Sequence, residues 1–221
     1  MRQIALVPLI GAVLLIAGCG GGTATSTTSI TVAGSRSCAH TTQPAARTPL
    51  TLKPPATRLG PTKRWTLEFV TSCGTFVVAL TPRTSPRAAA SFVALARRGY
   101  FDRTIFHRIV PGFVIQGGDP TQSGSGGPGY TTVDTPGTGT RYLRGVVAMA
   151  KTGAEPRGAA GSQFFVITAD APSLPPDYAV VGRVASGLGV VEKIGELGDA
   201  SDPNGAPTQT VVVEHVTVAA R

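Results

Sequence analysis

Charged side chains are scarce in this sequence: Asp, Glu, Lys and Arg make up 14% of its 221 residues. The formal net charge is +8, but the basic residues are scattered and form neither a long block nor a known nucleic-acid-binding motif. We therefore expect no nucleic-acid partner. The three histidines (His40, His107 and His215) lie far apart without metal-ligand spacing, so we expect no metal site.

Motifs for phosphate binding and for serine hydrolysis are also missing. Residues 123–129 are rich in glycine and serine, but they lack the Gly-Lys-Ser/Thr ending of a phosphate-binding loop and precede no obvious helix. Ser162 stands at the entrance to a strand rather than in the strand–turn–helix elbow of a hydrolase. We therefore interpret residues 123–129 as a flexible loop.

The sequence lacks an apolar run of the roughly 20 residues that a comfortable membrane span needs. A shorter apolar run at residues 4–16 follows the basic Arg2, which is typical of a secretory signal; an uncleaved anchor helix is the alternative. Residues 15–19 (LIAGC) resemble a bacterial lipobox. This resemblance implies a signal peptide at residues 1–18 and a lipid-modified Cys19, so we expect the mature protein to be anchored to the extracytoplasmic face of a membrane.

Residues 20–62 are rich first in glycine, serine and threonine and then in proline. Such a composition buries too little apolar surface to offset the entropy of the chain. We therefore expect residues 19–62 to form a flexible tether that links the lipid to a folded domain at residues 63–221.

Cysteine is rare, with three residues in the chain. If Cys19 is acylated, Cys38 and Cys73 remain as an even pair in an oxidising compartment, which favours a disulfide between them. Closing a loop of about 35 residues would stabilise the fold by roughly 4 kcal/mol. Two unpaired cysteines are the alternative.

The domain is rich in turn residues, and its pattern favours short strands. Residues 65–70 and 75–80 predict a hairpin, and Thr84-Ser85-Pro86 predicts a helix start with a hydroxyl cap. That helix ends at Gly99. A second, short helix is expected at about residues 187–194. Further short apolar runs indicate a mainly β, closed antiparallel barrel rather than a doubly wound sheet; they lie at residues 104–110, 113–116, 145–150, 163–169, 179–184 and 210–218.

Three segments of the domain are the most informative. Residues 106–120 read FHRIVPGFVIQGGDP, residues 161–166 read GSQFFV, and residues 147–150 between them read VAMA. They closely resemble the signatures of the cyclophilins, in the same order and at nearly the same spacing, and the resemblance covers roughly residues 64–221. It implies an eight-stranded antiparallel β-barrel closed by two helices, peptidyl-prolyl cis–trans isomerase activity, and no cofactor.

The resemblance also implies an active site. Arg108 matches the family's catalytic arginine, Gln116 the glutamine that orients it, and Phe113 a wall of the proline pocket. The implied substrate-binding residues are Val114, Met149, Ala150, Lys151, Gln163, Phe165, Leu174 and Tyr178. Because side chains alternate along a strand, we expect Phe164 to face the core and Phe165 the groove. His107 is expected to be a structural hydrogen-bonding residue rather than a catalyst.

The sequence departs from the best-known family pattern at three positions. Ser173 stands where many members carry tryptophan, Tyr178 where they carry histidine, and Lys151 where asparagine is common. Loss of the indole removes a hydrogen-bond donor and a large pocket wall. We therefore expect weaker binding of cyclosporin A than in tryptophan-containing members.

We expect a monomer that binds proline-containing segments of extracytoplasmic proteins and assists their folding. The alternatives are a non-catalytic module that binds proline peptides on the same fold, and a protein of this fold that works mainly as an adhesin or chaperone. Intact Arg108, Phe113 and Gln116 favour the enzyme.

Overall fold

The computed structural model describes residues 37–60 and 62–221. The expected signal peptide, the lipidation site Cys19 and the tether as far as residue 36 lie outside the described residues. The described residues form one compact unit. Among the described residues, no helix combines the length and the apolar character needed to cross a membrane.

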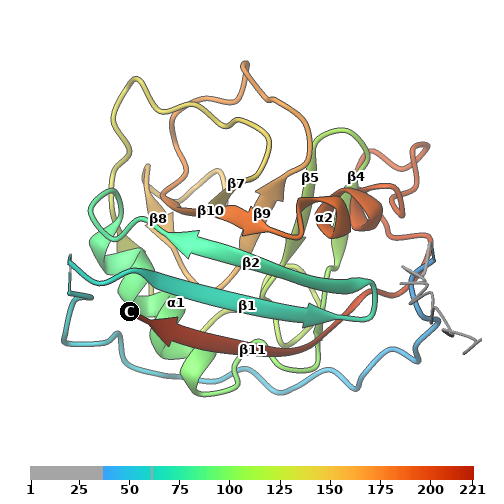
Figure 1. Ribbon diagram of the computed structural model, residues 1–221, viewed down its shortest axis with the longest axis horizontal. Coiled ribbons are helices and arrows are strands. Elements are labelled where there is room, and N and C mark those ends of the chain that lie inside the picture. The colour runs from blue at the N-terminus through green and yellow to red at the C-terminus, as the bar shows by residue number, and fades with distance from the viewer. Residues whose placement is uncertain (1–36, 61) are drawn as a thin grey trace, which may run out of the picture. The chain divides into compact units, whose positions relative to one another are not determined.

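The core of the fold is one antiparallel sheet in the order β3-β11-β1-β2-β10-β7-β9-β5-β4, shown in Figure 1. The hairpin predicted near residue 72 is formed by its third and fourth strands, β1 and β2. A second, two-stranded sheet pairs β6 (Thr132–Val133) with β8 (Ala159–Ala160), and neither of these strands was predicted. The strands of the large sheet are β1 (Trp65–Thr71), β2 (Gly74–Leu80), β3 (Thr104–Ile105), β4 (Arg108–Val110), β5 (Val114–Gly117), β7 (Val146–Met149), β9 (Phe164–Ile167), β10 (Val180–Ser186) and β11 (Val212–Ala220).

The two ends of the large sheet are neighbours in the chain. β3 is its first strand and β4 its last, and only Phe106 and His107 separate them in sequence. The sheet must therefore curl so that its two ends lie near each other, which gives a barrel-like antiparallel sheet as predicted. The run at residues 104–110 was expected to be one strand. Its interruption at Phe106 and His107 is the reason that the sheet contains nine strands rather than eight.

Two helices pack against the sheet, at opposite ends of β2 in Figure 1. α1 (Pro86–Arg97) packs against β11 and β6, and α2 (Leu188–Gly195) packs against β2, β4 and β5. Both helices were predicted.

The hydroxyl cap expected for α1 is wrong. Ser85 is the N-cap residue, but its side chain makes no capping hydrogen bond. The buried carboxylate of Asp134 takes this role, because its Oδ2 accepts hydrogen bonds from the backbone N–H groups of Arg87 (2.8 Å) and Ala88 (2.7 Å). A carboxylate also favours the positive end of the helix dipole, so this long-range cap links α1 to β6.

An aromatic cluster fills the barrel around Phe164 of β9. The ring centroid of Phe164 lies 5.3 Å from that of Phe69, 5.2 Å from that of Phe92 and 5.9 Å from that of Phe101. Phe92 comes from α1, so the helix contributes directly to the core. Such aromatic pairs add to the stabilisation that burial of their area provides.

Residues 38–60, which we call the strap, differ from the expected flexible tether. They lie along the domain as the blue segment in Figure 1. Backbone hydrogen bonds join Ala39 to Ser72 (2.8 Å), while Leu52 and Leu59 pack against the core. The composition of this segment gave no sign of these contacts, because its backbone partners lie in loops of the domain that are distant in sequence.

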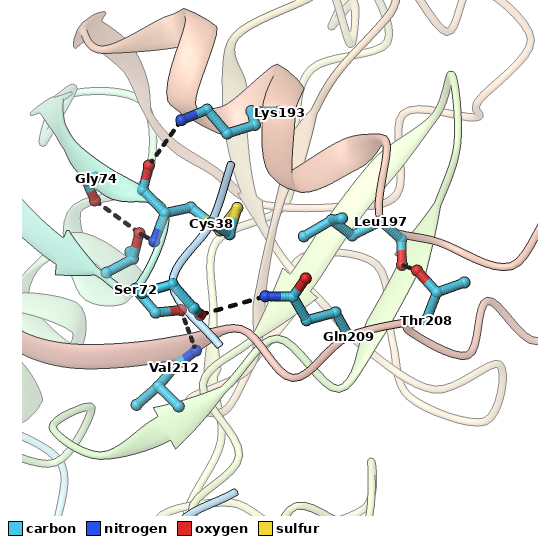
Figure 2. The surroundings of a disulfide bond; sticks show 11 residues. Cys38, Ser72, Gly74, Lys193, Leu197, Thr208, Gln209 and Val212 are labelled. Atoms are coloured by element: carbon cyan, nitrogen blue, oxygen red, sulfur yellow. Dashed lines mark hydrogen bonds between the residues drawn. A yellow bond between two sulfur atoms is a disulfide. The ribbon is translucent and has the colours of Figure 1, made fainter. Parts of the chain in front are cut away.

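A disulfide joins the start of the strap to the turn between β1 and β2. Cys38 and Cys73, the pair predicted from the sequence, are bonded and both are buried. Figure 2 shows the polar groups around the bond: Lys193 Nζ donates to the Cys73 carbonyl (3.3 Å), and Ser72 Oγ accepts from the Val212 N–H (3.1 Å). The bond therefore fixes the strap beside α2 and the start of β11.

Replacement of both Cys38 and Cys73 by serine is expected to lower the free energy of unfolding by roughly 4 kcal/mol, because the bond closes a long loop in the unfolded chain. Denaturant unfolding of the oxidised protein and of the variant measures this difference. A reductant should lower the stability of the wild-type protein and leave that of the variant unchanged. Equal denaturation midpoints for the two oxidised proteins would contradict the prediction.

Candidate active site

Arg108 and Gln116 face each other across a tight hairpin. They are directly paired in the register of β4 and β5, and Arg108 Nη1 donates to Gln116 Oε1 at 3.4 Å. The turn between these strands contains Gly112 at a φ of +68°, a conformation that side chains other than glycine rarely adopt. The local sequence therefore brings the two predicted catalytic side chains together.

Arg108 is held on its other side by the loop that precedes β11. Its Nε donates to the carbonyl oxygen of Asn204 at 3.1 Å. None of the ion pairs in the described part of the chain involves Arg108. The guanidinium is thus oriented by neutral acceptors, and no carboxylate competes for its remaining donors.

A row of hydrogen bonds continues from Gln116 across the neighbouring strands. Gln116 Nε2 donates to Gln163 Oε1 (3.0 Å), and Gln163 Nε2 donates to the carbonyls of Gly124 (2.9 Å) and Gly126 (3.0 Å). Each glutamine is held at both ends of its amide. The row connects the guanidinium to the glycine-rich loop at residues 123–129.

A second apolar cluster, separate from the central core, packs on β5, β7 and β9; we call this side of the sheet the groove, because it carries the residues expected to hold the proline. Phe165 and Val114 are buried in this cluster. The Phe165 ring meets the Tyr178 ring edge-on, with centroids 5.3 Å apart. The other predicted residues that pack on this cluster are partly buried; they are Phe113, Ala150, Leu174 and Tyr178. As predicted, Phe164 faces the core instead.

Met149 does not line the groove. It is fully buried and belongs to the central core, whereas Ala148 before it and Ala150 after it belong to the groove cluster. The reason is the alternation of side chains along β7, which sends every second residue to the same face. The resemblance to the family placed Met149 in the correct strand, but the register of β7 directs its side chain to the core face, opposite to the groove.

Lys151 lies at the rim of the groove and its ammonium is held there. Its Nζ donates to the carbonyls of Thr152 (3.1 Å) and Glu155 (3.2 Å) and lies 5.7 Å from the centroid of the Tyr178 ring. This cation–π contact places the positive charge against the ring, a geometry that stabilises both groups.

Tyr142 is a groove residue that the sequence analysis missed. Its hydroxyl donates to the Tyr178 carbonyl (2.8 Å) and accepts from the Tyr178 N–H (2.9 Å), and its ring is fully buried. It therefore positions Tyr178. A large aromatic residue between the turn-rich residues 135–141 and β7 was the available signal, because such a side chain is usually buried.

The comparisons with known proteins agree with this geometry. The family model described as "Cyclophilin type peptidyl-prolyl cis-trans isomerase/CLD" matches residues 66–218, which is more than half of the chain. The chain belongs to the cyclophilin-type peptidyl-prolyl cis–trans isomerases. The cyclophilin domain thus includes β4, β5, β7 and β9, the strands that build the groove.

Individual relatives cover the same part of the chain. "Peptidyl-prolyl cis-trans isomerase-like 1" of Gibberella zeae is 38% identical over 136 residues, which are 60% of this chain and 82% of the relative. "Peptidyl-prolyl cis-trans isomerase CYP18-2" of Arabidopsis thaliana is 39% identical, with coverage of 60% and 80%. A crystal structure of a Cryptosporidium parvum cyclophilin matches with a TM-score of 0.64 and 29% identity, over 72% of this chain and 99% of that one.

No cluster of three or more potential metal ligands occurs among the described residues of the domain. His107 also departs from expectation, since neither of its ring nitrogens has a hydrogen-bond partner in the described structure. Burial lowers the pKa of His107 below its ordinary value, which favours the neutral ring. The His107 ring lies beside the glycine-rich loop, where a Cβ on Gly124 would come into van der Waals contact with it.

Asp119 organises the glycine-rich loop from inside. Its buried carboxylate accepts hydrogen bonds from the backbone N–H groups of Thr121 (2.8 Å), Gly124 (2.7 Å) and Gly126 (3.1 Å). A Cβ on residue 126 would lie 2.0 Å from Asp119 Oδ1, so only glycine fits there. Burial raises the pKa of Asp119, but the hydrogen bonds from Thr121, Gly126 and Gly124 together lower it below its ordinary value.

We predict that Asp119→Asn lowers the free energy of unfolding by about 2 kcal/mol near neutral pH, because hydrogen bonds to a charged acceptor are lost. The native pKa lies below that of the unfolded chain, so the carboxylate's contribution is complete above about pH 4 and is lost as the pH falls through the native pKa. Denaturant unfolding of both proteins at several pH values in this range measures the difference between their free energies of unfolding. A difference that does not become smaller in acid would count against the prediction.

Proposed function

We propose that the protein catalyses cis–trans isomerisation of Xaa–Pro bonds, with Arg108 as the catalytic residue. The observation that carries this proposal is the position of Arg108: its guanidinium is fixed by Gln116 and Asn204 and has no carboxylate partner in the described structure. An apolar groove that contains Phe113, Phe165 and Leu174 lies beside the same strands.

Rotation of the prolyl bond is slow because the C–N bond loses its partial double-bond character, at a cost of about 18–20 kcal/mol. At the twisted transition state the proline nitrogen regains a localised lone pair. A hydrogen-bond donor aimed at that nitrogen stabilises the transition state more than either ground state. A guanidinium suits this role, because it is rigid and remains charged at any physiological pH.

The other residues of the site hold the substrate. The groove binds the proline ring by apolar contact while the residue before the proline swings round. Gln116 orients Arg108, and the rim residues Ala150, Lys151 and Gln163 hold the main chain of the peptide. A structure of the Cryptosporidium parvum cyclophilin, 28% identical to this chain, was solved in the presence of the dipeptide Ala-Pro. That structure supports a proline-containing segment as the ligand class here.

Arg108→Ala is expected to lower kcat/KM for a short Xaa–Pro peptide by about tenfold or more, because the donor to the proline nitrogen is lost. Arg183→Ala is the matched control, since Arg183 is an exposed arginine on β10 outside the groove. A protease-coupled or NMR exchange assay measures the rate, and circular dichroism verifies the fold.

Equal activity of Arg108→Ala and the wild-type protein would overturn the catalytic role of Arg108. A wild-type protein that binds proline peptides without isomerising them would identify the alternative, a non-catalytic binding module.

We further propose that the enzyme acts on secreted or cell-envelope proteins, anchored through lipid on Cys19. The lipobox-like residues 15–19 support the anchor. The Cys38–Cys73 bond supports an oxidising compartment, because structural disulfides are rare in the cytosol. A position at the membrane would place the groove where proline-containing chains emerge and fold.

For the anchor, we expect the full-length protein expressed in a bacterium to fractionate with membranes and to carry acyl chains in mass spectrometry. Cys19→Ala should abolish acylation and move the protein to the soluble or membrane-spanning precursor form, because one thiol provides the attachment point. Cys38→Ser is the control for a general loss of cysteine. Identical masses for the mature wild-type protein and the Cys19→Ala variant, apart from the substitution, would refute lipidation.

A further inference from the structure

A cavity of about 820 Å³ adjoins the active site on the side of the glycine-rich loop. Four of the residues that line it also belong to the proposed substrate site; they are Gln116, Ala150, Lys151 and Gln163. The glycine-rich loop forms a second wall. The third wall comes from outside the strands of the barrel, because Pro49, Leu50 and Thr51 of the strap line the cavity as well.

Leu50 is the unusual member of this wall. Its side chain is 44% exposed, and only two other large hydrophobic residues of the described chain, Val133 and Leu143, are classed with it as exposed. A single exposed leucine needs no special explanation. Leu50, however, lines a cavity that also contains Pro128 and Ala150, so a bound apolar group would remove several apolar surfaces from water together.

The strap is anchored on both sides of Leu50. On one side, the Arg47 N–H donates to the Pro120 carbonyl (2.9 Å), and the Arg47 guanidinium donates to the Tyr100 carbonyl just beyond α1. On the other side, the Leu52 N–H donates to the Pro128 carbonyl at 2.7 Å. Leu50 is therefore held in position before any ligand binds, which reduces the entropy lost on binding.

The loop that faces the strap fits it closely. A Cβ on Gly129 would lie 2.8 Å from the Cα of Thr51, so the two backbones approach each other at a distance that only glycine permits. The wall is thus a built part of the cavity rather than a segment that rests loosely on it.

We propose that Leu50 determines substrate specificity: the strap completes a subsite that takes an apolar side chain of the polypeptide substrate. This inference rests on the proposed isomerase function. Gln116 and Gln163 belong both to the proposed substrate site and to the cavity lining, so a peptide held along this rim reaches the cavity near its proline. The preferred substrates therefore carry a leucine-like residue within a few residues of the proline.

The test uses two peptide series that place either leucine or alanine at each position up to three residues before or after one proline. Both kcat/KM and the dissociation constant are measured for the wild-type protein, Leu50→Ser, Leu50→Met and Leu143→Ser. Leu143 is a matched control, because it is a comparably exposed leucine that does not line this cavity.

At one position we expect the wild-type protein to prefer leucine over alanine by about fivefold or more, since burial of the extra methylene groups is worth about 1 kcal/mol even when partial. Leu50→Ser should reduce this ratio to below about twofold, while Leu50→Met and Leu143→Ser should retain it. A ratio that is the same in Leu50→Ser and the wild-type protein at every position would overturn the proposal. Dissociation constants separate this failure from failure of the isomerase function, because they report the leucine preference even in a protein that does not turn over its peptides.

Discussion

Burial on both faces of β5, β7 and β9 is the constraint on which the site depends. Strand alternation sends Phe164 and Met149 into the central core and Phe165 and Ala148 into the groove cluster. The floor of the groove is therefore the reverse side of the core. A shift of one residue in the register of β9 would point Phe165 into the core and Phe164 into the groove, and it would disrupt the packing of both the core and the groove. The packing that stabilises the barrel is thus the same packing that fixes the shape of the groove.

The polar side chains of the site depend on hydrogen bonds that orient them. Arg108 and Gln116 come from β4 and β5 and Gln163 directly precedes β9, and their hydrogen bonds form one row that ends on the glycine-rich loop. Asp119 holds that loop from inside, so a buried carboxylate supports the row without contacting Arg108 through any ion pair of the described structure. Donors that are oriented before the substrate arrives need little reorganisation as the transition state forms. The negative charge of Asp119 therefore stabilises the glycine-rich loop from a position away from the bond that rotates.

The sequence predicted the hairpin, both helices and the apolar runs that form the groove strands, because each of these has a local pattern or a motif. It also predicted the opposite facing of Phe164 and Phe165. It failed where the decisive partner is remote. The cap of α1 comes from Asp134, which lies far along the chain from Ser85. Met149 matched a motif, but only the register of β7 reveals its direction. Tyr142 and the strap act through contacts with distant loops, and neither composition nor spacing contains that information.

The disulfide also limits how far the domain can extend from the proposed lipid anchor. Because the strap lies on the domain and Cys38 is bonded to Cys73, the segment that separates the proposed lipid on Cys19 from the domain contains roughly twenty residues, with a maximum length of roughly 65 Å. A tether that continued to residue 62 would reach roughly twice as far. With the proposed lipid in place, this shorter segment would keep the groove close to the bilayer and would raise its local concentration near chains that emerge there. Reduction of the bond would remove the covalent attachment at Cys38 and leave the hydrogen bonds of Arg47 and Leu52 to hold the rest of the strap.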